Sequence, residues 1–316
     1  AAGIVPAGHA SDGGGSIRIP ASACGLVGLK PTRGRTPIYP SVGTLAAPLS
    51  VQHALVRSVR DCALLLDIAA GGMPGDPVVA PAPLRPFTEE VGVAPGRLRV
   101  AFSVARPDGQ QVHEDCATAV RRLAQLLESL GHDVEEAAPL VPSEGIMTAL
   151  AIGMAAPLTA RVDAWLESTD RTLGDDDLEP FTRVIYDVGK GLSGVDVVRA
   201  LEAVERTGHA VGPFFERYDL LLTATIAEPA PALGVLDTTR PEVMYARAGD
   251  FSANTSIYNI TGQPAISLPT ALDAGGVPIG TQLAARFGDE ALLLRVASQI
   301  EAAEPWPTRP ALPQRF

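Results

Sequence analysis

Apolar residues recur at helical spacing in two stretches of the chain, residues 58–71 and 113–130. The first stretch begins with a serine, has an acid in its first turn and ends at a glycine, which are the usual signals of a helix. In the second, an apolar residue occurs at about every third or fourth position. Residues 97–103 and 132–136 flank the second predicted helix and are predicted as strands. This strand–helix–strand order predicts an α/β architecture with a largely parallel or mixed sheet.

Glycine and proline positions and shorter apolar runs divide the rest of the chain. Predicted strands cover residues 3–8, 24–29 and 218–225, followed by a hairpin from 262 to 285. Predicted helices cover residues 250–259 and 289–303 and most of 143–216, with breaks near 174 and 191–194. The predicted irregular segments are an extended loop, residues 33–57, and a proline-rich surface linker, residues 71–96.

Composition and charge narrow the classes of protein. The 316 residues, of which 46% are hydrophobic, allow one large domain or two small ones. The net charge of −11 and the lack of lysine- or arginine-rich blocks argue against a nucleic-acid partner. No uninterrupted run of about 18 apolar residues is present, so no membrane span is expected. Three widely spaced cysteines and five scattered histidines match neither a disulfide framework nor a metal site, which favours a cytoplasmic protein without bound metal.

The stretch that carries candidate chemistry runs from Gly8 to Pro20 and contains three consecutive glycines followed by Ser16. Regular helices and strands disfavour such glycines, but consecutive glycines can turn several backbone N–H groups toward one anion. A serine beside these donors has the arrangement that acyl transfer requires, a nucleophile with preset donors for the oxyanion. A glycine-rich turn with a capping serine is an alternative. A phosphate-binding loop is less favoured, because the Gly-Lys-Ser/Thr ending of a P-loop is missing.

The order of residues around Ser16 resembles the signature of a known enzyme family. The chain reads Ser-Asp-x-Gly-Gly-Ser-Ile-Arg-x-Pro and then Cys-Gly-Leu-Val-Gly-Leu-Lys-Pro-Thr. This motif resembles that of the amidase signature family of serine hydrolases, and most closely that of its branch with the cyclic-dimer hydrolase of nylon oligomers. The resemblance implies that Ser16 is the acyl nucleophile and that Asp12 and Arg18 support its loop. The implied oxyanion donors are the backbone N–H groups of four residues: Gly13, Gly14, Gly15 and Ser16.

The resemblance also implies the fold and the domain organisation. The expected fold is α/β, with a mixed, largely parallel central sheet covered by helices on both faces. Residues 1–316 are interpreted as a single amidase-signature domain truncated at its N-terminus, in which residues 143–216 form a variable helical region around the substrate pocket. In the family the base is a lysine, relayed through a second serine in a cis peptide, and both lie upstream of the nucleophile. Lys30 and Lys190 do not match that lysine, so residues 1–316 alone are expected to be inactive.

The favoured function is hydrolysis of a small-molecule amide, linear or cyclic, through an acyl-enzyme and without a cofactor. One alternative is a non-catalytic remnant or interaction module with the same fold. Another is the amidase subunit of a tRNA-dependent amidotransferase, in which glutamine usually occupies the position of Ile19. His53 is a candidate base, although a solvent or backbone partner for its ring is favoured, and Cys24 is expected to be a packing residue. The sequence leaves the oligomeric state open, including a homo-oligomer.

Overall fold

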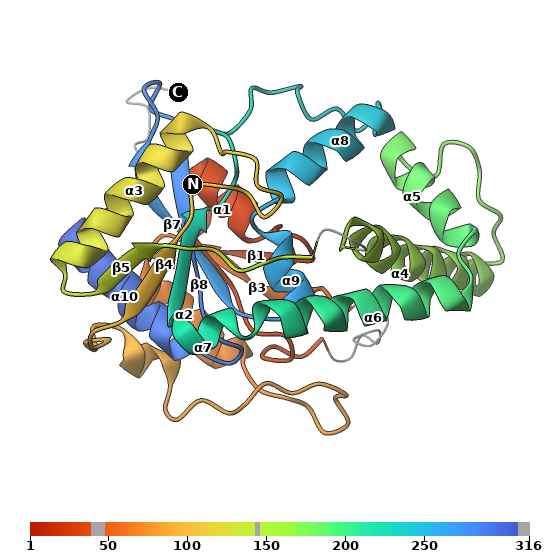
Figure 1. The fold of residues 1–316 in the computed structure, drawn as a ribbon. Helices are drawn as coiled ribbons and strands as arrows, with labels where there is room; N and C mark the ends of the chain where they lie inside the picture. Colours follow the sequence, from red (N-terminus) through yellow and green to blue (C-terminus); the bar gives the residue numbers. More distant parts are fainter. Residues whose placement is uncertain (39–47, 143–145, 309–316) are drawn as a thin grey trace.

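The computed structural model describes residues 1–38, 48–142 and 146–308, which form an eight-stranded sheet with helices around it (Figure 1). The strands are β1 (Gly8–Asp12), β2 (Val27–Lys30), β3 (Val51–Val56), β4 (Arg99–Phe102), β5 (Asp133–Glu136), β6 (Leu220–Ala224), β7 (Ala265–Leu272) and β8 (Pro278–Ala284). Their order across the sheet is β1-β3-β2-β7-β8-β6-β4-β5. The N-terminal strands therefore meet the C-terminal strands β7 and β8 in the centre of the sheet, and β1 lies at an edge.

Both parallel and antiparallel neighbours occur in the sheet. β4 pairs in parallel with β5 and with β6, and the other neighbouring pairs are antiparallel. The expected mixed sheet is confirmed, but its parallel part is smaller than expected. The reason is the connections: β7 and β8 follow each other directly as a hairpin, which makes them antiparallel, whereas a parallel pair such as β4 and β5 needs a helical crossover.

Helices cover both faces of the sheet. They are α1 (Arg18–Cys24), α2 (Val59–Ala69), α3 (Glu114–Ser129), α4 (Ile146–Thr169), α5 (Pro180–Lys190), α6 (Gly194–Val211), α7 (Phe214–Arg217), α8 (Pro241–Ser252), α9 (Ser256–Thr261) and α10 (Glu290–Ala303), with a short 3-10 helix at Phe87–Glu90. The main apolar core lies beneath α2, α3 and α10, and α1, α7 and α9 pack on the opposite face. Because neighbouring strand residues point to opposite faces, Val100 of β4 joins the main core and Ala101 joins the other. The expected helical cover of both faces is confirmed.

The two helices with the clearest sequence signals are also confirmed, as α2 and α3. The hydroxyl of Ser58 accepts the Asp61 N–H over 3.1 Å and caps α2. His113 caps α3, because its Nδ1 accepts the Asp115 N–H over 3.3 Å. Both helices thus begin where a side chain satisfies one of the N–H groups that have no partner within the helix.

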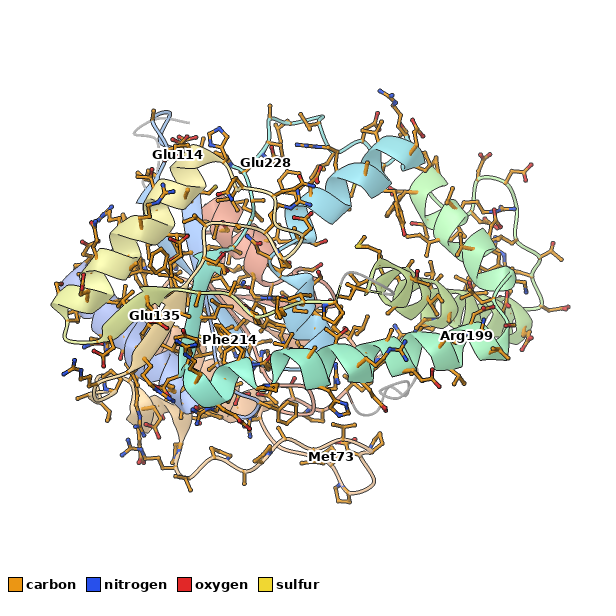
Figure 2. The ribbon with its side chains drawn as sticks, viewed as in Figure 1. Met73, Glu114, Glu135, Arg199, Phe214 and Glu228 are labelled. Carbon is orange, nitrogen blue, oxygen red and sulfur yellow. The ribbon has the colours of Figure 1, made fainter. Side chains whose placement is uncertain are left out.

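Helices α4, α5 and α6 form a helical lobe beside the sheet (Figure 1). Arg199 of α6 lies on this lobe, whereas Phe214 of α7 lies at the sheet (Figure 2). Four buried residues of the lobe form a small apolar cluster of their own: Ala149, Ile152, Ala200 and Ala203. The predicted helical content of residues 143–216 and the breaks before α5 and α6 are confirmed, with residues 143–145 outside the described range. A role of this region at a substrate pocket stays a prediction.

Helix α4 is long and apolar enough to cross a membrane by length and composition, and it is the one such helix in the described part of the chain. It contacts α5 and α6, and Ile152 and Leu166 are buried, whereas Met147, Met154 and Trp165 are exposed. A single helix of this kind is weak support for a membrane span. The expectation of no membrane partner stays a prediction.

Several elements differ from those predicted. β1 covers residues 8–12 rather than 3–8. β3 lies inside the predicted loop 33–57, part of which is outside the described residues. α1 and β2 replace the strand predicted for residues 24–29. The prediction that Cys24 is a packing residue is wrong, because Cys24 ends α1 at the protein surface and is exposed.

Candidate active site

The glycine-rich segment joins the end of β1 to the start of α1, and Ser16 lies at the turn between them. Asp12 ends the strand and is fully buried, whereas Ser16 is exposed. Gly15 has a φ of +141°, a backbone conformation that residues with a side chain rarely adopt. A Cβ atom there would lie within 3.0 Å of Thr255 Oγ1 and of Ile19 Cδ1. Glycine at this position therefore allows the turn that leads into Ser16.

The backbone N–H groups that lead into Ser16 are free of protein acceptors. Among the described residues, none of the N–H groups from Gly13 to Ser16 donates a hydrogen bond. The next N–H group, of Ile17, is already used, because it donates to Asp12 Oδ2 over 3.2 Å. Gly13 and Gly14 are half-buried. Four unused donors beside an exposed hydroxyl can bind a negatively charged oxygen.

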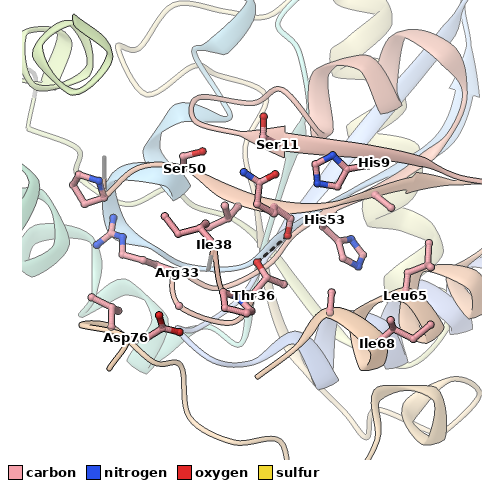
Figure 3. A pocket seen from close by; sticks show the side chains of 18 of the residues that line it. His9, Ser11, Arg33, Thr36, Ile38, Ser50, His53, Leu65, Ile68 and Asp76 are labelled. Carbon is pink, nitrogen blue, oxygen red and sulfur yellow. Dashed lines mark hydrogen bonds between the residues drawn. The ribbon is translucent and has the colours of Figure 1, made fainter. Parts of the chain in front are cut away.

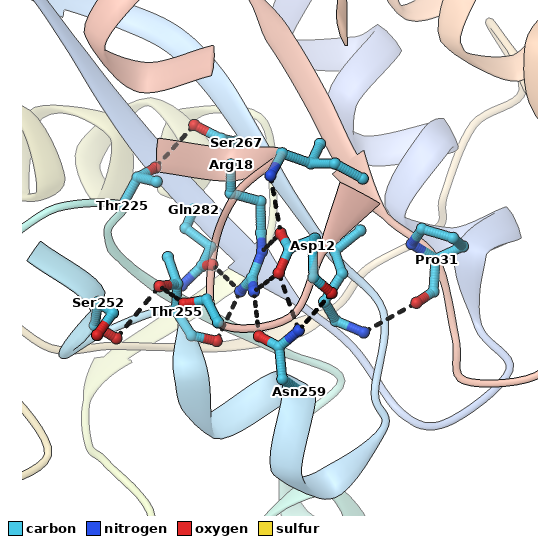
Figure 4. Close-up of polar contacts among 12 residues, drawn as sticks. Asp12, Arg18, Pro31, Thr225, Ser252, Thr255, Asn259, Ser267 and Gln282 are labelled. Atoms are coloured by element: carbon cyan, nitrogen blue, oxygen red, sulfur yellow. Dashed lines mark hydrogen bonds and ion pairs between the residues drawn. The ribbon is translucent and has the colours of Figure 1, made fainter. Parts of the chain in front are cut away.

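Arg18 and Asp12 form a buried ion pair beside this loop (Figure 4). Both side chains are 0% exposed, and Arg18 Nε and Nη2 donate to the two carboxylate oxygens over 2.9 and 3.0 Å. The other guanidinium donors reach Thr255 O over 2.8 Å, Gln282 Oε1 over 2.7 Å and Asn259 Oδ1 over 2.7 Å. All five N–H groups of the guanidinium are therefore satisfied, which a buried arginine requires.

The ion pair keeps Asp12 charged. Burial acts to raise the pKa of Asp12, but the charge and the hydrogen bonds of Arg18 oppose it, and the pKa lies below its ordinary value. Asn259 Nδ2 adds hydrogen bonds to Asp12 Oδ1 over 2.9 Å and to Asp12 O over 2.8 Å. Removing one partner of a buried ion pair typically costs about 3–5 kcal/mol. The ion pair therefore joins the residue that ends β1 to the first residue of α1, on either side of the glycine loop.

Three residues of this network were not among the sequence candidates: Thr255, Asn259 and Gln282. All three are buried, two of them around α9 and one on β8. A signal was present in the predicted helix 250–259, which contains several polar residues that need partners if the helix is buried. No local pattern shows that this partner is Arg18, because these hydrogen bonds join residues 237 to 264 positions apart.

Lys30 is fully buried, and its Nζ donates to Pro31 O over 2.8 Å. Burial, followed by the positive charge of Arg18, lowers the pKa of Lys30 well below its ordinary value. The amine is bound by the backbone of the adjacent residue, a contact that fits a structural role. This agrees with the interpretation that Lys30 is not the base of the reaction.

His53 lines a separate hollow of about 1020 Å³ beside β1 and β3 (Figure 3). His9 and Ser11 line the same hollow, and Ser16 is not one of its described lining residues. His53 is 4% exposed, and neither ring nitrogen has a hydrogen-bond partner within the described part of the chain. Burial, the largest cause, lowers the pKa of His53 to about 4. The ring is thus neutral at pH 7, but no contact supports it as a base for Ser16.

Lowering the pH from about 6.5 to about 4 is expected to reduce the free energy of unfolding through His53. In the unfolded chain the ring binds a proton below a pKa of about 6.5, whereas in the folded protein its pKa is about 4. The unfolded state binds more protons in this window, so the free energy of unfolding decreases as the pH is lowered, by up to about 3 kcal/mol. Urea denaturation of the wild type and of His53→Gln at several pH values measures this effect. The fall should be smaller in His53→Gln, and parallel pH profiles would contradict a buried neutral ring.

Comparison with models of protein families matches residues 1–294 to the family described as Amidase. The chain belongs to the amidase signature family. The 6-aminohexanoate-cyclic-dimer hydrolase of Paenarthrobacter ureafaciens is 34% identical over 321 residues, which cover 98% of this chain and 65% of that protein. The protein of the same name from Pseudomonas sp. (strain NK87) is 35% identical over 328 residues, with the same coverage. The resemblance read from the sequence is confirmed.

Amidase signature proteins of known structure share the fold of this chain. The structure of 6-aminohexanoate cyclic dimer hydrolase with its substrate matches with a TM-score of 0.90 at 34% identity and covers 98% of this chain. The match extends over 66% of that structure's own chain. This amidase signature chain therefore spans about 65% of the length of the curated relatives it matches.

Family membership does not test the individual residues of the site. The roles of Ser16 as nucleophile, of the four N–H groups and of the Asp12–Arg18 pair stay predictions, as do the truncated single domain and the cytoplasmic location. Within residues 1–38, 48–142 and 146–308, no group of three or more His, Cys, Asp or Glu side chains could hold a metal ion. The expectation of a reaction without metal likewise stays a prediction.

Proposed function

We propose that this chain carries the nucleophile and the oxyanion donors of an amide hydrolase. The main support is that the exposed Ser16 directly follows N–H groups with no protein acceptor among the described residues. The buried pair of Asp12 and Arg18 fixes both ends of the loop that presents them. Membership of the amidase signature family, whose members hydrolyse amides, agrees with this chemistry.

In the proposed reaction, Ser16 Oγ bonds to the carbonyl carbon of the amide and gives its proton to a base. The carbonyl oxygen becomes an oxyanion, which the N–H groups from Gly13 to Ser16 stabilise. The carbon–nitrogen bond then breaks, the proton passes to the leaving amine, and an acyl ester remains on Ser16. Water attacks the ester while the base takes a proton from it. The acid leaves as Ser16 regains its proton, so the route needs no cofactor.

The base in this proposal is a lysine, relayed through a second serine, in a part of the complete protein upstream of these residues. This assignment of the base rests on the likeness of the Ser16 loop to the amidase signature. The curated relatives are longer than this chain, which agrees with a base outside residues 1–316. Neither lysine of the chain offers a free amine to Ser16. Lys30 donates to a backbone carbonyl, and the hydrogen bond from Lys190 to Asp163, over 2.8 Å, raises the pKa of Lys190. Residues 1–316 alone should therefore hydrolyse amides no faster than their Ser16→Ala variant.

The substrate in this proposal is a small linear or cyclic amide. By their names, the two curated relatives hydrolyse the cyclic dimer of 6-aminohexanoate. We place the acyl side of the pocket near the helical lobe, within residues 143–216. The support is that α6 of the lobe contacts α9, the helix that carries Asn259 and begins directly after Thr255.

The type of base predicts the pH dependence of the complete protein. A lysine acts as a base only when neutral, so burial must lower its pKa from the reference value of about 10.4. We expect kcat/KM on a neutral amide to rise with pH through this lowered pKa and to stay high under mildly alkaline conditions. Replacing the upstream lysine with alanine should remove most of the rate. A profile already flat from about pH 6, together with loss of activity in His53→Gln, would instead make a histidine the base.

A further inference from the structure

Thr255 reaches the nucleophile loop from the distant C-terminal part of the chain (Figure 4). It lies between α8 and α9 and is fully buried. Its hydroxyl donates to Gly14 O over 2.6 Å, whereas its other acceptor, Ser252 O, is 3.2 Å away. A hydroxyl carries a single proton. The shorter contact, with Gly14, is therefore the favoured hydrogen bond.

The bond to Gly14 O sets the direction of the Gly15 N–H. A peptide unit is planar and trans, so its carbonyl and its N–H point in opposite directions. With Gly14 O directed at Thr255, the Gly15 N–H points away from Thr255, and no described residue accepts it. Glycine tolerates more backbone conformations than other residues. The Gly14–Gly15 peptide therefore needs an external contact to stay in one orientation.

Thr255 is itself fixed by the buried ion pair. Its carbonyl oxygen accepts from Arg18 Nη1 over 2.8 Å. On the other side of the peptide, Gly15 O accepts from the Ile19 N–H over 2.7 Å, which ties Gly15 to α1. The Thr255 hydroxyl is thus a rigid support that faces Gly14 O, and it leaves no room for a Cβ atom on Gly15.

We propose that Thr255 is a positioning residue that directs the Gly15 N–H at the oxyanion, an inference that rests on the proposed acyl transfer at Ser16. If the Gly14–Gly15 peptide turned over, Gly14 O would face the reacting oxygen in place of the N–H and repel its negative charge. Loss of one oxyanion donor typically lowers kcat by about 10²–10³-fold. Thr255 acts on the reaction through this peptide and does not touch the reacting atoms.

The test compares Thr255→Val, Thr255→Ser and Thr225→Val in the complete protein. Valine keeps the shape of threonine without its hydroxyl, and serine keeps the hydroxyl. Thr225 is the matched control, because it is also fully buried and its hydroxyl is bonded to Ser267 Oγ over 2.8 Å (Figure 4). We expect Thr255→Val to lower kcat by about 10- to 100-fold with little change in KM. Thr255→Ser should restore most of the rate, and Thr225→Val should leave it unchanged.

A boronic acid inhibitor separates the loss of an oxyanion donor from a general loosening of the protein. A boronate forms a tetrahedral adduct with a nucleophilic serine, and one of its oxygens takes the place of the oxyanion. Thr255→Val should therefore weaken boronate inhibition by about the same factor as it lowers kcat, because both depend on the same donor. Its melting temperature should stay close to that of Thr225→Val.

Three results would overturn the inference. The first is an unchanged kcat in Thr255→Val, and the second is an equal loss of rate in Thr255→Val and Thr225→Val. If Thr255→Val does not fold, Thr255→Cys replaces it, because a thiol is a weak donor. Thr255→Cys should then be slower than Thr255→Ser, and equal rates would be the third contrary result. A fully active Ser16→Ala protein would overturn the proposed function itself, and the inference with it.

Discussion

Replacing Ser16 with alanine in the complete protein is expected to lower kcat by at least about 10⁴-fold, because no acyl-enzyme can form. The oxyanion donors are backbone groups and stay in place, so a small residual rate above the uncatalysed reaction should remain. The stability of the fold should not change, since the Ser16 side chain is exposed. Steady-state kinetics on an amide and thermal unfolding measure the two effects separately.

The matched control for this experiment is Ser11→Ala. Ser11 is also exposed and lies on β1, but it lines the hollow beside His53 and not the glycine loop. The Ser11→Ala variant should therefore keep the wild-type rate. Equal losses in the two variants, or full activity in Ser16→Ala, would show that Ser16 is not the nucleophile.

The second large effect is expected for Gly15→Ala. Its φ of +141° is strained for alanine, at a typical cost of about 1–3 kcal/mol. The new Cβ atom would also lie within 3.0 Å of Thr255 Oγ1 and of Ile19 Cδ1, so the loop must move. We expect the free energy of unfolding to fall by about 2 kcal/mol or more. Movement of the donors should lower kcat by about 10²–10³-fold, and chemical denaturation with kinetics measures both.

Two other glycines provide controls for this substitution. A Cβ atom on Gly8 or on Gly13 would meet nothing within 4 Å. Gly8→Ala, on β1, should keep both the stability and the rate of the wild type. Gly13→Ala keeps its N–H in the loop and should lose less rate than Gly15→Ala. A Gly15→Ala protein as stable and active as Gly8→Ala would refute the conformational requirement at Gly15.

Elements with complete local signals were predictable from the sequence. α2 and α3 combine an apolar stripe with a capping side chain, and both signals lie within the helix or next to it. α1 has neither, because it has seven residues, a proline in its first turn and no side-chain cap. β3 was missed because the adjacent residues His53 and Ala54 are both buried, which breaks the alternation expected of a strand. Burial on both faces of a central strand is set by distant parts of the chain.

The candidate site was predictable only where it is contiguous. Asp12, Ser16 and Arg18 fall within one short motif, so the order of residues was enough to bring them together. Thr255 and Asn259 contact the same loop from more than 230 positions away. Only the folded sheet, in which β2 pairs with β7, brings the two ends of the chain together.

Covalent labelling of the complete protein with a fluorophosphonate, followed by mass spectrometry of its peptides, tests the central claim most directly. The reagent modifies activated serine nucleophiles, so we expect a single adduct on Ser16 that is absent from Ser16→Ala. The nearby alternatives are the exposed Ser11 and the buried Ser22, whose hydroxyl accepts the Gly280 N–H over 2.9 Å. An adduct on Ser11 or Ser22, or an active protein without an adduct on Ser16, would contradict the assignment of the nucleophile.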